Sequence, residues 1–356
     1  MVGTAIFLGA GASKADGAPL QGELFQQYFS SRLYKDSIDE MDRELATFFL
    51  EMFQINVDED VSKISFPTFE EVLGLTDLAI LRKEAFRHFD IENRAANSGR
   101  LRYIAQYLVF LVAKVLDSKL EYRPTSHRKL VTALHEGKEL KNVLFVSTNY
   151  DILIDNALTE AQVDGIDLDY GVDFRNFDRP DDWRRPRIDS RVSLFKPHGS
   201  LNWLFCPTCN ELEITPKEKG VVTRLISDFA HAACPQCGSV YSPLIVPPTF
   251  YKDLNNVFLS SIWNRTDVAL RKVSHIVFCG YSFPDADIHI KYLLKRAQTN
   301  RAAPLRITVI NNHPGKRPAE AQHEQDRYKR FLGNAVNYTD KSFEDFIGDP
   351  LTVLRR

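Results

Sequence analysis

Four of the chain's five cysteines are arranged in two pairs that together could bind a metal ion. Cys206 and Cys209 form the first Cys-x-x-Cys pair, and Cys234 and Cys237 form the second. Each pair folds as a tight turn that points two thiolates at one centre, and two such turns complete the tetrahedral sulfur site that suits Zn²⁺. Because protein fills every position, such a zinc ion is structural. The alternative is a redox dithiol, which is usually a single Cys-x-x-Cys at the start of a helix.

A glycine-rich turn follows the first apolar run of the chain. Residues 5–8 favour a β-strand, and Gly9, Ala10, Gly11, Ala12 and Ser13 follow where a strand would turn into a helix. Such a turn lets a ligand approach the backbone, and its N–H groups can bind a phosphate. The dinucleotide fingerprint G-x-G-x-x-G is incomplete, because Lys14 occupies its sixth position. From these residues alone, a tight β–α turn and a nucleotide site are equally good interpretations.

Polar residues follow two further apolar runs. Asn149 and Asp151 come after residues 142–147, and His198 stands between a proline and a glycine after residues 192–196. Ligands bind at the carboxyl ends of the strands in open parallel sheets, so these side chains are candidates for a catalytic site. His198 has the chemistry of a general base. For Asn149 and Asp151, capping of the following helix is an equally good interpretation.

Two more apolar runs end in polar or glycine residues. Gly280 and Ser282 follow residues 275–279 and come before another helical pattern. Asn311 follows residues 305–310, where it could either bind a ribose or cap a turn.

The strand-like runs alternate with helical patterns, which lie at residues 21–32, 152–161 and 288–298. This alternation predicts an α/β fold, with a Rossmann-like parallel sheet covered by helices on both faces. We expect the core of that fold to consist of residues 1–36, 137–200 and 249–320.

Two stretches interrupt the alternation. Residues 37–136 have helical periodicity, with one apolar face running from Leu101 to Val115, and predict an inserted helical module. Residues 201–248 contain the paired cysteines and predict a zinc-ribbon module. Residues 321–356 predict a C-terminal helical tail, and residues 171–189, rich in Arg and Asp, predict a loop.

The chain's size, charge and apolar segments limit its partners and its compartment. Its 356 residues are 44% hydrophobic and 26% charged, as is ordinary for a soluble globular protein. With a formal net charge of −2, nothing draws the whole chain to nucleic acid or to an anionic membrane, and we expect direct binding to neither. The N-terminus lacks the basic region of a signal peptide, and no apolar run is long enough to span a bilayer. The paired cysteines suit a reducing compartment, so we expect a cytoplasmic protein.

Taken in order, these features resemble the sirtuin family. Gly9–Ser13 followed by Gly17–Pro19 is similar to the sirtuin opening GAGxS-xxx-GIP, and Thr148–Asp151 resembles the T-x-N-x-D segment. His198-Gly199 corresponds to the catalytic His-Gly, and the cysteine pairs follow it as the zinc ribbon does in sirtuins. Gly280–Ser282 and Ile310-Asn311 match the G-x-S and Ile-Asn segments, so the resemblance covers residues 6–312. It implies an NAD⁺ site formed by Gly9–Ser13, Gly280, Ser282 and Asn311.

Three departures from the sirtuin deacylases point to a divergent branch. Leu20-Gln21-Gly22 follows Pro19 where the deacylases have Asp-Phe-Arg, and Ser242–Leu254 replaces their Phe-Gly-Glu-type segment. The helical insertion is also longer than in compact deacylases. These departures resemble bacterial sirtuin-like proteins of anti-phage systems, which hydrolyse NAD⁺ instead of deacylating proteins.

The resemblance to that branch implies an NAD⁺ hydrolase that cleaves the nicotinamide–ribose bond. The residues matching Asn149 and His198 are then the catalytic pair, with Asn149 positioning the ribose or a water and His198 acting as base. Asp151 is expected to bind near the carboxamide or to orient its loop. Zn²⁺ is expected as a structural ion and NAD⁺ as the substrate.

The same resemblance implies a homo-oligomer that works with a partner ATPase or another defence-system protein. Two alternative functions stay open. One is a protein-lysine deacylase or ADP-ribosyltransferase, which shares the NAD⁺ site but needs an acceptor channel. The other is a non-enzymatic sensor that binds NAD⁺ or ADP-ribose, against which the presence of both Asn149 and His198 argues.

Overall fold

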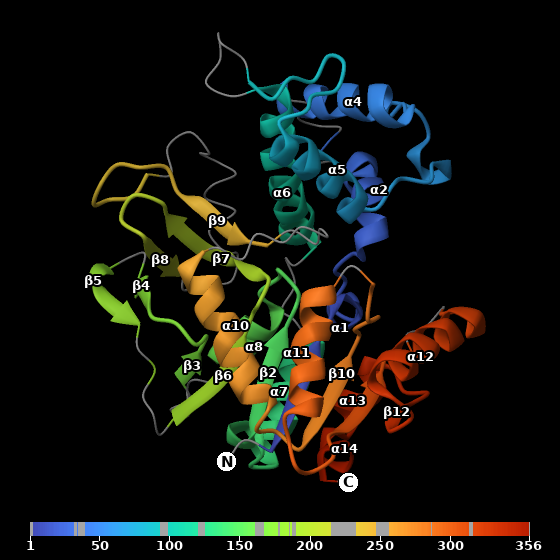
Figure 1. Cartoon of the computed structure of the whole chain (residues 1–356), viewed down its shortest axis with the longest axis vertical. Helices are drawn as coiled ribbons and strands as arrows, with labels where there is room; N and C mark the ends of the chain where they lie inside the picture. The colour runs from blue at the N-terminus through green and yellow to red at the C-terminus, as the bar shows by residue number, and fades with distance from the viewer. Residues whose placement is uncertain are drawn as a thin grey trace. The chain divides into compact units, whose positions relative to one another are not determined.

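A computed structural model describes residues 3–31, 34, 40–92, 99–119, 125–160, 167–176, 179–184, 186, 190–214, 233–246, 256–285, 287–312 and 316–355 (Figure 1). The chain forms two compact units. Unit 1 consists of Met1–Ala18, Tyr122–Val246 and Asp253–Arg356, and unit 2 consists of Pro19–Glu121 and Pro247–Lys252. The longer segment of unit 2, Pro19–Glu121, therefore begins and ends earlier than the predicted helical insertion at 37–136. Helix α7 (Thr125–Glu136) belongs to unit 1 because it packs against α8 (Leu153–Glu160).

Unit 1 is built on a seven-stranded sheet in the order β12-β11-β10-β1-β2-β6-β3, and all of its strand pairs are parallel. The strands are β1 (Thr4–Leu8), β2 (Val143–Ser147), β3 (Asp167–Asp169), β6 (Arg191–Phe195), β10 (His275–Cys279), β11 (Arg306–Ile310) and β12 (Val336–Tyr338). The predicted α/β fold class with a parallel sheet is confirmed. All residues of β1, β2 and β10 are buried, as expected for strands covered on both faces.

Helices surround this sheet. They are α1 (Ala10–Lys14), α7, α8, α10 (Val257–Leu270), α11 (Ile288–Thr299), α12 (Pro318–Leu332), α13 (Phe343–Gly348) and α14 (Pro350–Arg355), and the 3₁₀ turn η3 (Leu140–Asn142) precedes β2. Helix α7 packs against α8, α13 and α14, and Figure 1 shows α10 and α11 lying side by side in front of the strands. The predicted helical tail at 321–356 also contains a strand, β12, which forms one edge of the sheet.

A second, five-stranded sheet in unit 1 has the order β5-β4-β8-β7-β9. Its strands are β4 (Phe174–Asn176), β5 (Arg179–Arg184), β7 (Gly199–Cys206), β8 (Glu211–Ile214) and β9 (Ser242–Ile245). The prediction of a loop at 171–189 is wrong, because β4 and β5 pair there as an antiparallel ribbon. Phe174 explains the difference, since its ring is buried against Tyr170 and Trp203. Of the predicted zinc ribbon, residues 215–232 and 247–248 lie outside the described residues.

The described residues of unit 2 include helices α2 (Leu24–Ser30), α4 (Glu40–Phe53), α5 (Phe69–Arg82) and α6 (Arg100–Lys119), with 3₁₀ turns η1 (Gln21–Glu23) and η2 (Val61–Lys63). Helix α6 packs against α2, α4 and α5. The predicted helix at 21–32 is thus a 3₁₀ turn followed by a shorter α-helix. No helix among the described residues is both long enough and apolar enough to cross a membrane.

Candidate functional site

The carboxyl ends of five neighbouring strands bring the predicted site segments to one edge of the large sheet. In the register of the sheet, Leu8 at the end of β1 pairs with Cys279 of β10 on one side and Ser147 of β2 on the other. Cys279 in turn pairs with Ile310, and Val146 pairs with Phe195. Later strands lie on both sides of β1, so the order of the strands reverses there. Ligands bind at such reversals, called switch points, in open α/β sheets.

The glycine turn after β1 packs directly against the turn after β10. The Gly9 N–H donates to the carbonyl oxygen of Cys279 at 2.9 Å, and the Gly11 N–H donates to that of Gly280 at 2.8 Å. A Cβ atom on Gly11 would lie 2.8 Å from the Gly280 Cα atom, and one on Gly280 would lie 1.9 Å from the Ala12 nitrogen. Gly280 also has a φ of 64°, which side chains disfavour. These glycines therefore have a packing role that needs no ligand.

Helix α7 holds the far end of the glycine turn. The Asp16 carboxylate accepts hydrogen bonds from the backbone N–H groups of Ser126 and His127, and it lies 2.5 Å from His127 Nδ1. Burial alone would raise the pKa of Asp16, but the hydrogen bonds from His127 and Ser126 hold it below its ordinary value. An ionised aspartate at the start of a helix is also favoured by the helix dipole. Asp16 thus ties α1 to the helix that leads into β2.

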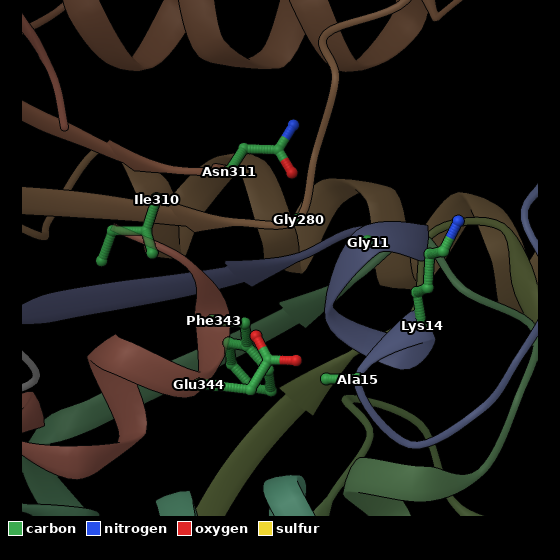
Figure 2. Close-up of a pocket in the computed structure, with 8 residues that line it drawn as sticks. All are labelled: Gly11, Lys14, Ala15, Gly280, Ile310, Asn311, Phe343 and Glu344. Carbon is green, nitrogen blue, oxygen red and sulfur yellow. The ribbon is translucent and has the colours of Figure 1, made fainter. Parts of the chain in front are cut away.

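A cavity of about 200 Å³ opens beside the two packed turns (Figure 2). Its lining comes from α1, from the ends of β10 and β11, and from α13: Gly11, Lys14, Ala15, Gly280, Ile310, Asn311, Phe343 and Glu344. Three of the residues predicted to bind NAD⁺ line it, namely Gly11, Gly280 and Asn311. Ser282 does not line it; its side chain is exposed and its carbonyl oxygen accepts from Arg327.

Sequence reasoning missed the cavity residues Phe343 and Glu344. They belong to the first turn of α13, which reaches the glycine turn through the fold alone. No local motif marks them, so only the packing of α13 against α7 could reveal them.

Asn311 is held in place by a buried carboxylate. Its Nδ2 donates to Glu324 Oε1 at 2.7 Å, and Glu324 also accepts from Lys316 Nζ at 2.9 Å and from the Tyr338 hydroxyl at 2.8 Å. The Asn311 amide nitrogen therefore faces α12 and is committed to Glu324. Its Oδ1 is on the side of Gly11, 3.0 Å from where a Cβ atom of that glycine would stand.

Asn149 and Asp151 meet the glycine turn through Ser13. Asn149 Nδ2 donates to the Gly9 carbonyl oxygen at 2.9 Å and to Ser13 Oγ at 2.7 Å. Ser13 Oγ donates to Asp151 Oδ2 at 2.7 Å, and Asp151 Oδ1 accepts from the backbone N–H of Leu153 at 3.1 Å. Asp151 thus holds Ser13 with one oxygen and the start of α8 with the other. These contacts join residues from two motifs that were predicted separately, Ser13 of the glycine turn and the pair Asn149 and Asp151.

A buried lysine links this loop to the turn that carries His198. The Lys196 side chain is fully buried, and its Nζ lies 2.5 Å from the Asp151 carbonyl oxygen, 2.6 Å from Ser200 Oγ and 3.1 Å from Asp155 Oδ2. The other Asp155 oxygen accepts from the Tyr170 hydroxyl at 2.5 Å. Sequence reasoning did not select Lys196, although a lysine that ends an apolar strand two residues before a candidate base is a usable signal.

His198 lies in a tight turn and is paired with an aspartate that the sequence analysis did not select. The Gly199 N–H donates to the Lys196 carbonyl oxygen at 3.0 Å, which closes the turn. The imidazole is buried, and its Nε2 lies 3.9 Å from Asp287 Oδ1. The Tyr281 hydroxyl donates to the other oxygen of Asp287 at 2.9 Å. The ring of Trp263 stands 6.4 Å from that of His198.

The four paired cysteines converge as a tetrahedral metal site requires. Their Sγ atoms all lie within 4.8 Å of one another, with Cys206 and Cys237 3.5 Å apart and Cys209 and Cys234 3.9 Å apart. Four sulfurs bound to one zinc at the usual bond length are separated by about 3.8 Å. The cysteines therefore fit Zn²⁺, and they form the only such cluster of metal-binding side chains in the part of the chain that the structure describes.

Each cysteine pair is closed by a residue in the left-handed conformation. The Asn210 N–H donates to the Cys206 carbonyl oxygen at 2.9 Å, and the Gly238 N–H donates to that of Cys234 at 2.8 Å. The φ angles of Asn210 and Gly238 are 54° and 73°. These two residue types tolerate that conformation best, so each turn reverses tightly enough to point its two thiolates inward.

Comparisons with known proteins give one family match. The SIR2-like domain matches residues 143–332, just over half of the chain. No curated protein sequence matches the chain. Among solved structures, the chain is similar to Sir2 in complex with the inhibitor EX-527, 2′-O-acetyl-ADP-ribose and a deacetylated p53 peptide (13% identity, 99% of this chain and 93% of that chain covered, TM-score 0.41). It is also similar to Sir2Tm bound to a propionylated peptide (13% identity, 99% and 92% covered, TM-score 0.42). A third similar structure is Sir2 with a p53 peptide and NAD⁺ (12% identity, 99% and 92% covered, TM-score 0.42).

Proposed function

The chain belongs to the SIR2-like family, and from that premise we propose that it hydrolyses NAD⁺ to nicotinamide and ADP-ribose. One observation carries the proposal: the hydrogen-bonded series Asn149–Ser13–Asp151 joins the glycine turn to the loop after β2. Lys196 joins the same loop to the turn of the candidate base His198. Polar groups of the kinds that ribose chemistry needs thus share one edge of the sheet.

At C1′ of the ribose, the reaction breaks one bond and forms one. Nicotinamide leaves with the electron pair of the bond between its ring nitrogen and C1′ of the ribose, because that nitrogen is cationic in NAD⁺. A water oxygen bonds to C1′ of the oxocarbenium-like ribose, and the water proton passes to His198. Asn149 positions the ribose hydroxyls or this water, which lowers the entropic cost of the attack. Buried polar groups whose positions are already fixed then stabilise the developing charge without reorganising.

The dinucleotide is assigned to the cavity beside the glycine turn. Gly11, Gly280 and Asn311 line it, and Lys14 adds a cation suited to a pyrophosphate. The Gly11 N–H already donates to Gly280, so a phosphate would need other donors, such as the Lys14 ammonium group. Gly9, Ala10, Ala12 and Ser13 would support the ligand by shaping the turn after β1, and Ser282 would do so from the segment that follows β10.

Asp151 has a supporting role in this scheme. Both of its carboxylate oxygens are engaged, one by Ser13 and the other by the start of α8. It would therefore orient the loop that carries Asn149. Zn²⁺ held by Cys206, Cys209, Cys234 and Cys237 would stabilise the second sheet and take no part in the reaction, since protein sulfur fills its coordination shell.

The biological part of the proposal is a cytoplasmic NAD⁺-depleting effector of bacterial anti-phage defence, acting as a homo-oligomer with a partner ATPase or another defence protein. Its support is the sequence: Leu20-Gln21-Gly22 after Pro19, the segment Ser242–Leu254, and the long helical unit. All three depart from the deacylase pattern in the direction of that branch.

One experiment tests the enzymatic proposal. Purified protein is incubated with NAD⁺, alone and with lysate of phage-infected cells, and nicotinamide, ADP-ribose and cyclic products are resolved by chromatography. Equal amounts of nicotinamide and ADP-ribose are expected, and the His198→Ala protein should release neither. Parallel reactions contain an acyl-lysine peptide. If O-acyl-ADP-ribose forms in them, the activity of the protein is deacylation and the hydrolase proposal is wrong. NAD⁺ left intact under every condition would make a sensor the better assignment.

A further inference from the structure

Two aspartates precede helix α11, and the structure treats them differently. Asp285 is 68% exposed and pairs with Lys291 Nζ at 2.7 Å. Asp287 is buried, accepts from the Tyr281 hydroxyl and faces His198 Nε2 at 3.9 Å. The same residue type, two positions apart, is thus exposed and paired with a lysine in one case, and buried facing the candidate catalytic base in the other.

Asp287 occupies the N-cap position of α11 but makes no capping hydrogen bond with its side chain. Aspartate is favoured at an N-cap because its carboxylate accepts from the free N–H groups of the first turn. Here the carboxylate turns instead toward Tyr281 and His198. Helix stability therefore does not explain its orientation.

We infer that Asp287 is the carboxylate that positions His198 and stabilises its protonated form during cleavage of the nicotinamide–ribose bond, an inference that rests on the proposed function. When His198 takes the water proton, its ring becomes an imidazolium cation next to the Asp287 anion. The attraction is strong because both groups are buried and little water screens them. The dipole of α11, a helix of 12 residues, favours the ionised carboxylate at its N-terminus.

The distance of 3.9 Å is longer than a direct hydrogen bond. Catalytic hydrogen bonds are often long before substrate binds and shorten in the complex. Tyr281 limits how Asp287 can move, because the tyrosine hydroxyl donates to one carboxylate oxygen while the other carboxylate oxygen faces His198. The ring of a second histidine, His289, stands 6.2 Å from that of Trp263, the aromatic neighbour of His198.

The test uses Asp287→Asn in the full-length protein. Asparagine keeps the size of the side chain and an oxygen that can accept from Tyr281, but it removes the charge. Asp285→Asn is the matched control, since it makes the same change at an exposed site. Two readouts are combined: steady-state release of nicotinamide from NAD⁺, and the NMR titration of His198, assigned by comparison with His198→Ala.

We expect Asp287→Asn to lower kcat about 10²–10⁴-fold, the range for a disturbed general base, with KM and ADP-ribose affinity changed less than about threefold. The pKa of His198 should fall by at least about one unit, because a neighbouring carboxylate stabilises the charged ring. Asp287→Glu should recover part of the rate and of the shift. Asp285→Asn should change neither, and Asp287→Asn should add little to His198→Ala.

The two readouts separate this inference from the proposed function. If the wild type leaves NAD⁺ intact while the His198 titration still shifts in Asp287→Asn, the pairing stands and the hydrolase proposal fails. If the wild type hydrolyses NAD⁺ and Asp287→Asn leaves its rate unchanged, the inference is overturned and the hydrolase proposal stands. A slower variant with an unmoved His198 titration also overturns it, because Asp287 would then act by another route.

Discussion

Gly11 and Gly280 touch backbone to backbone: the Gly11 N–H donates to the Gly280 carbonyl oxygen at 2.8 Å, and neither position has room for a Cβ atom. This contact joins the turns after β1 and β10, the two strands at the switch point of the sheet. A side chain at either glycine therefore disturbs the protein even when no nucleotide is bound.

Gly280→Ala should therefore lower the free energy of unfolding. Overpacking costs about 1–3 kcal/mol, and the positive φ angle adds to it. The expected result in thermal unfolding without ligand is a melting temperature lower by several degrees. Gly3→Ala is the control, because no atom lies within 4 Å of its Cβ position and it should melt like the wild type. Equal melting of Gly280→Ala and the wild type would contradict the packing role.

The cysteine cluster should bind about one Zn²⁺ per chain. Cys206→Ser should lose most of the metal and melt at a lower temperature, since metal-binding energy is partly folding energy. Metal content is measured by inductively coupled plasma mass spectrometry, and melting by calorimetry. Cys279→Ser is the control, because Cys279 lies buried in β10 and is not part of the cluster. This variant should bind as much zinc as the wild type. Full zinc content in Cys206→Ser would remove the assignment.

His198 and Asn149 should act as one catalytic unit. Either alanine variant should lower the rate of NAD⁺ hydrolysis about 10²–10⁴-fold, and the double variant should be little slower. Binding of ADP-ribose, measured by calorimetry, should separate the two residues. It should be nearly unchanged in His198→Ala and weaker in Asn149→Ala, because the Asn149 amide also holds the Gly9 carbonyl oxygen and Ser13. Multiplicative losses in the double variant would argue for independent roles.

Lys196 and Asp155 should be strongly coupled. Lys196→Met leaves the buried Asp155 carboxylate without its cation, which costs about 3–5 kcal/mol in the free energy of unfolding. Chemical denaturation measures this loss. The exposed pair of Arg82 and Glu84 is the control, and Arg82→Ala should cost less than about 1 kcal/mol. A loss for Lys196→Met no larger than that of the control would contradict the importance of the buried pair.

His275 should make the protein less stable in acid. Burial and the nearby Arg306 lower the pKa of His275 to about 4, whereas an unfolded histidine titrates near its model value of 6.5. The unfolded state therefore binds the proton first as the pH falls. The loss of stability begins near pH 6.5, continues to about pH 4 and amounts to up to about 3 kcal/mol.

The variant His275→Asn tests this dependence. It removes the titrating ring, so its free energy of unfolding should fall less than that of the wild type over the same pH range. Denaturation curves at several pH values measure both slopes. Parallel slopes for the two proteins would assign the acid sensitivity to other groups.

The sequence by itself determined the parts of the protein that depend on local spacing. The runs that form β1, β2, β6, β10 and β11 were predictable because buried parallel strands are continuously apolar and end at glycine or polar residues. The cysteine cluster was predictable because two residues between cysteines permit one tight turn. Family membership followed from the order of such motifs. Short edge strands such as β3 and β12 have too few residues to produce a pattern.

Only the tertiary structure decided which side chains meet. Asp287 faces His198 although the two are far apart in sequence, because β6 and β10 both end at the same edge of the sheet. Glu344 reaches the cavity beside Gly11 because α13 packs on α7. Asn311 turns its amide to Glu324, a partner that no motif names. Strand order and helix packing arise from the summed burial of many residues, so no short segment contains the information that brings these groups together.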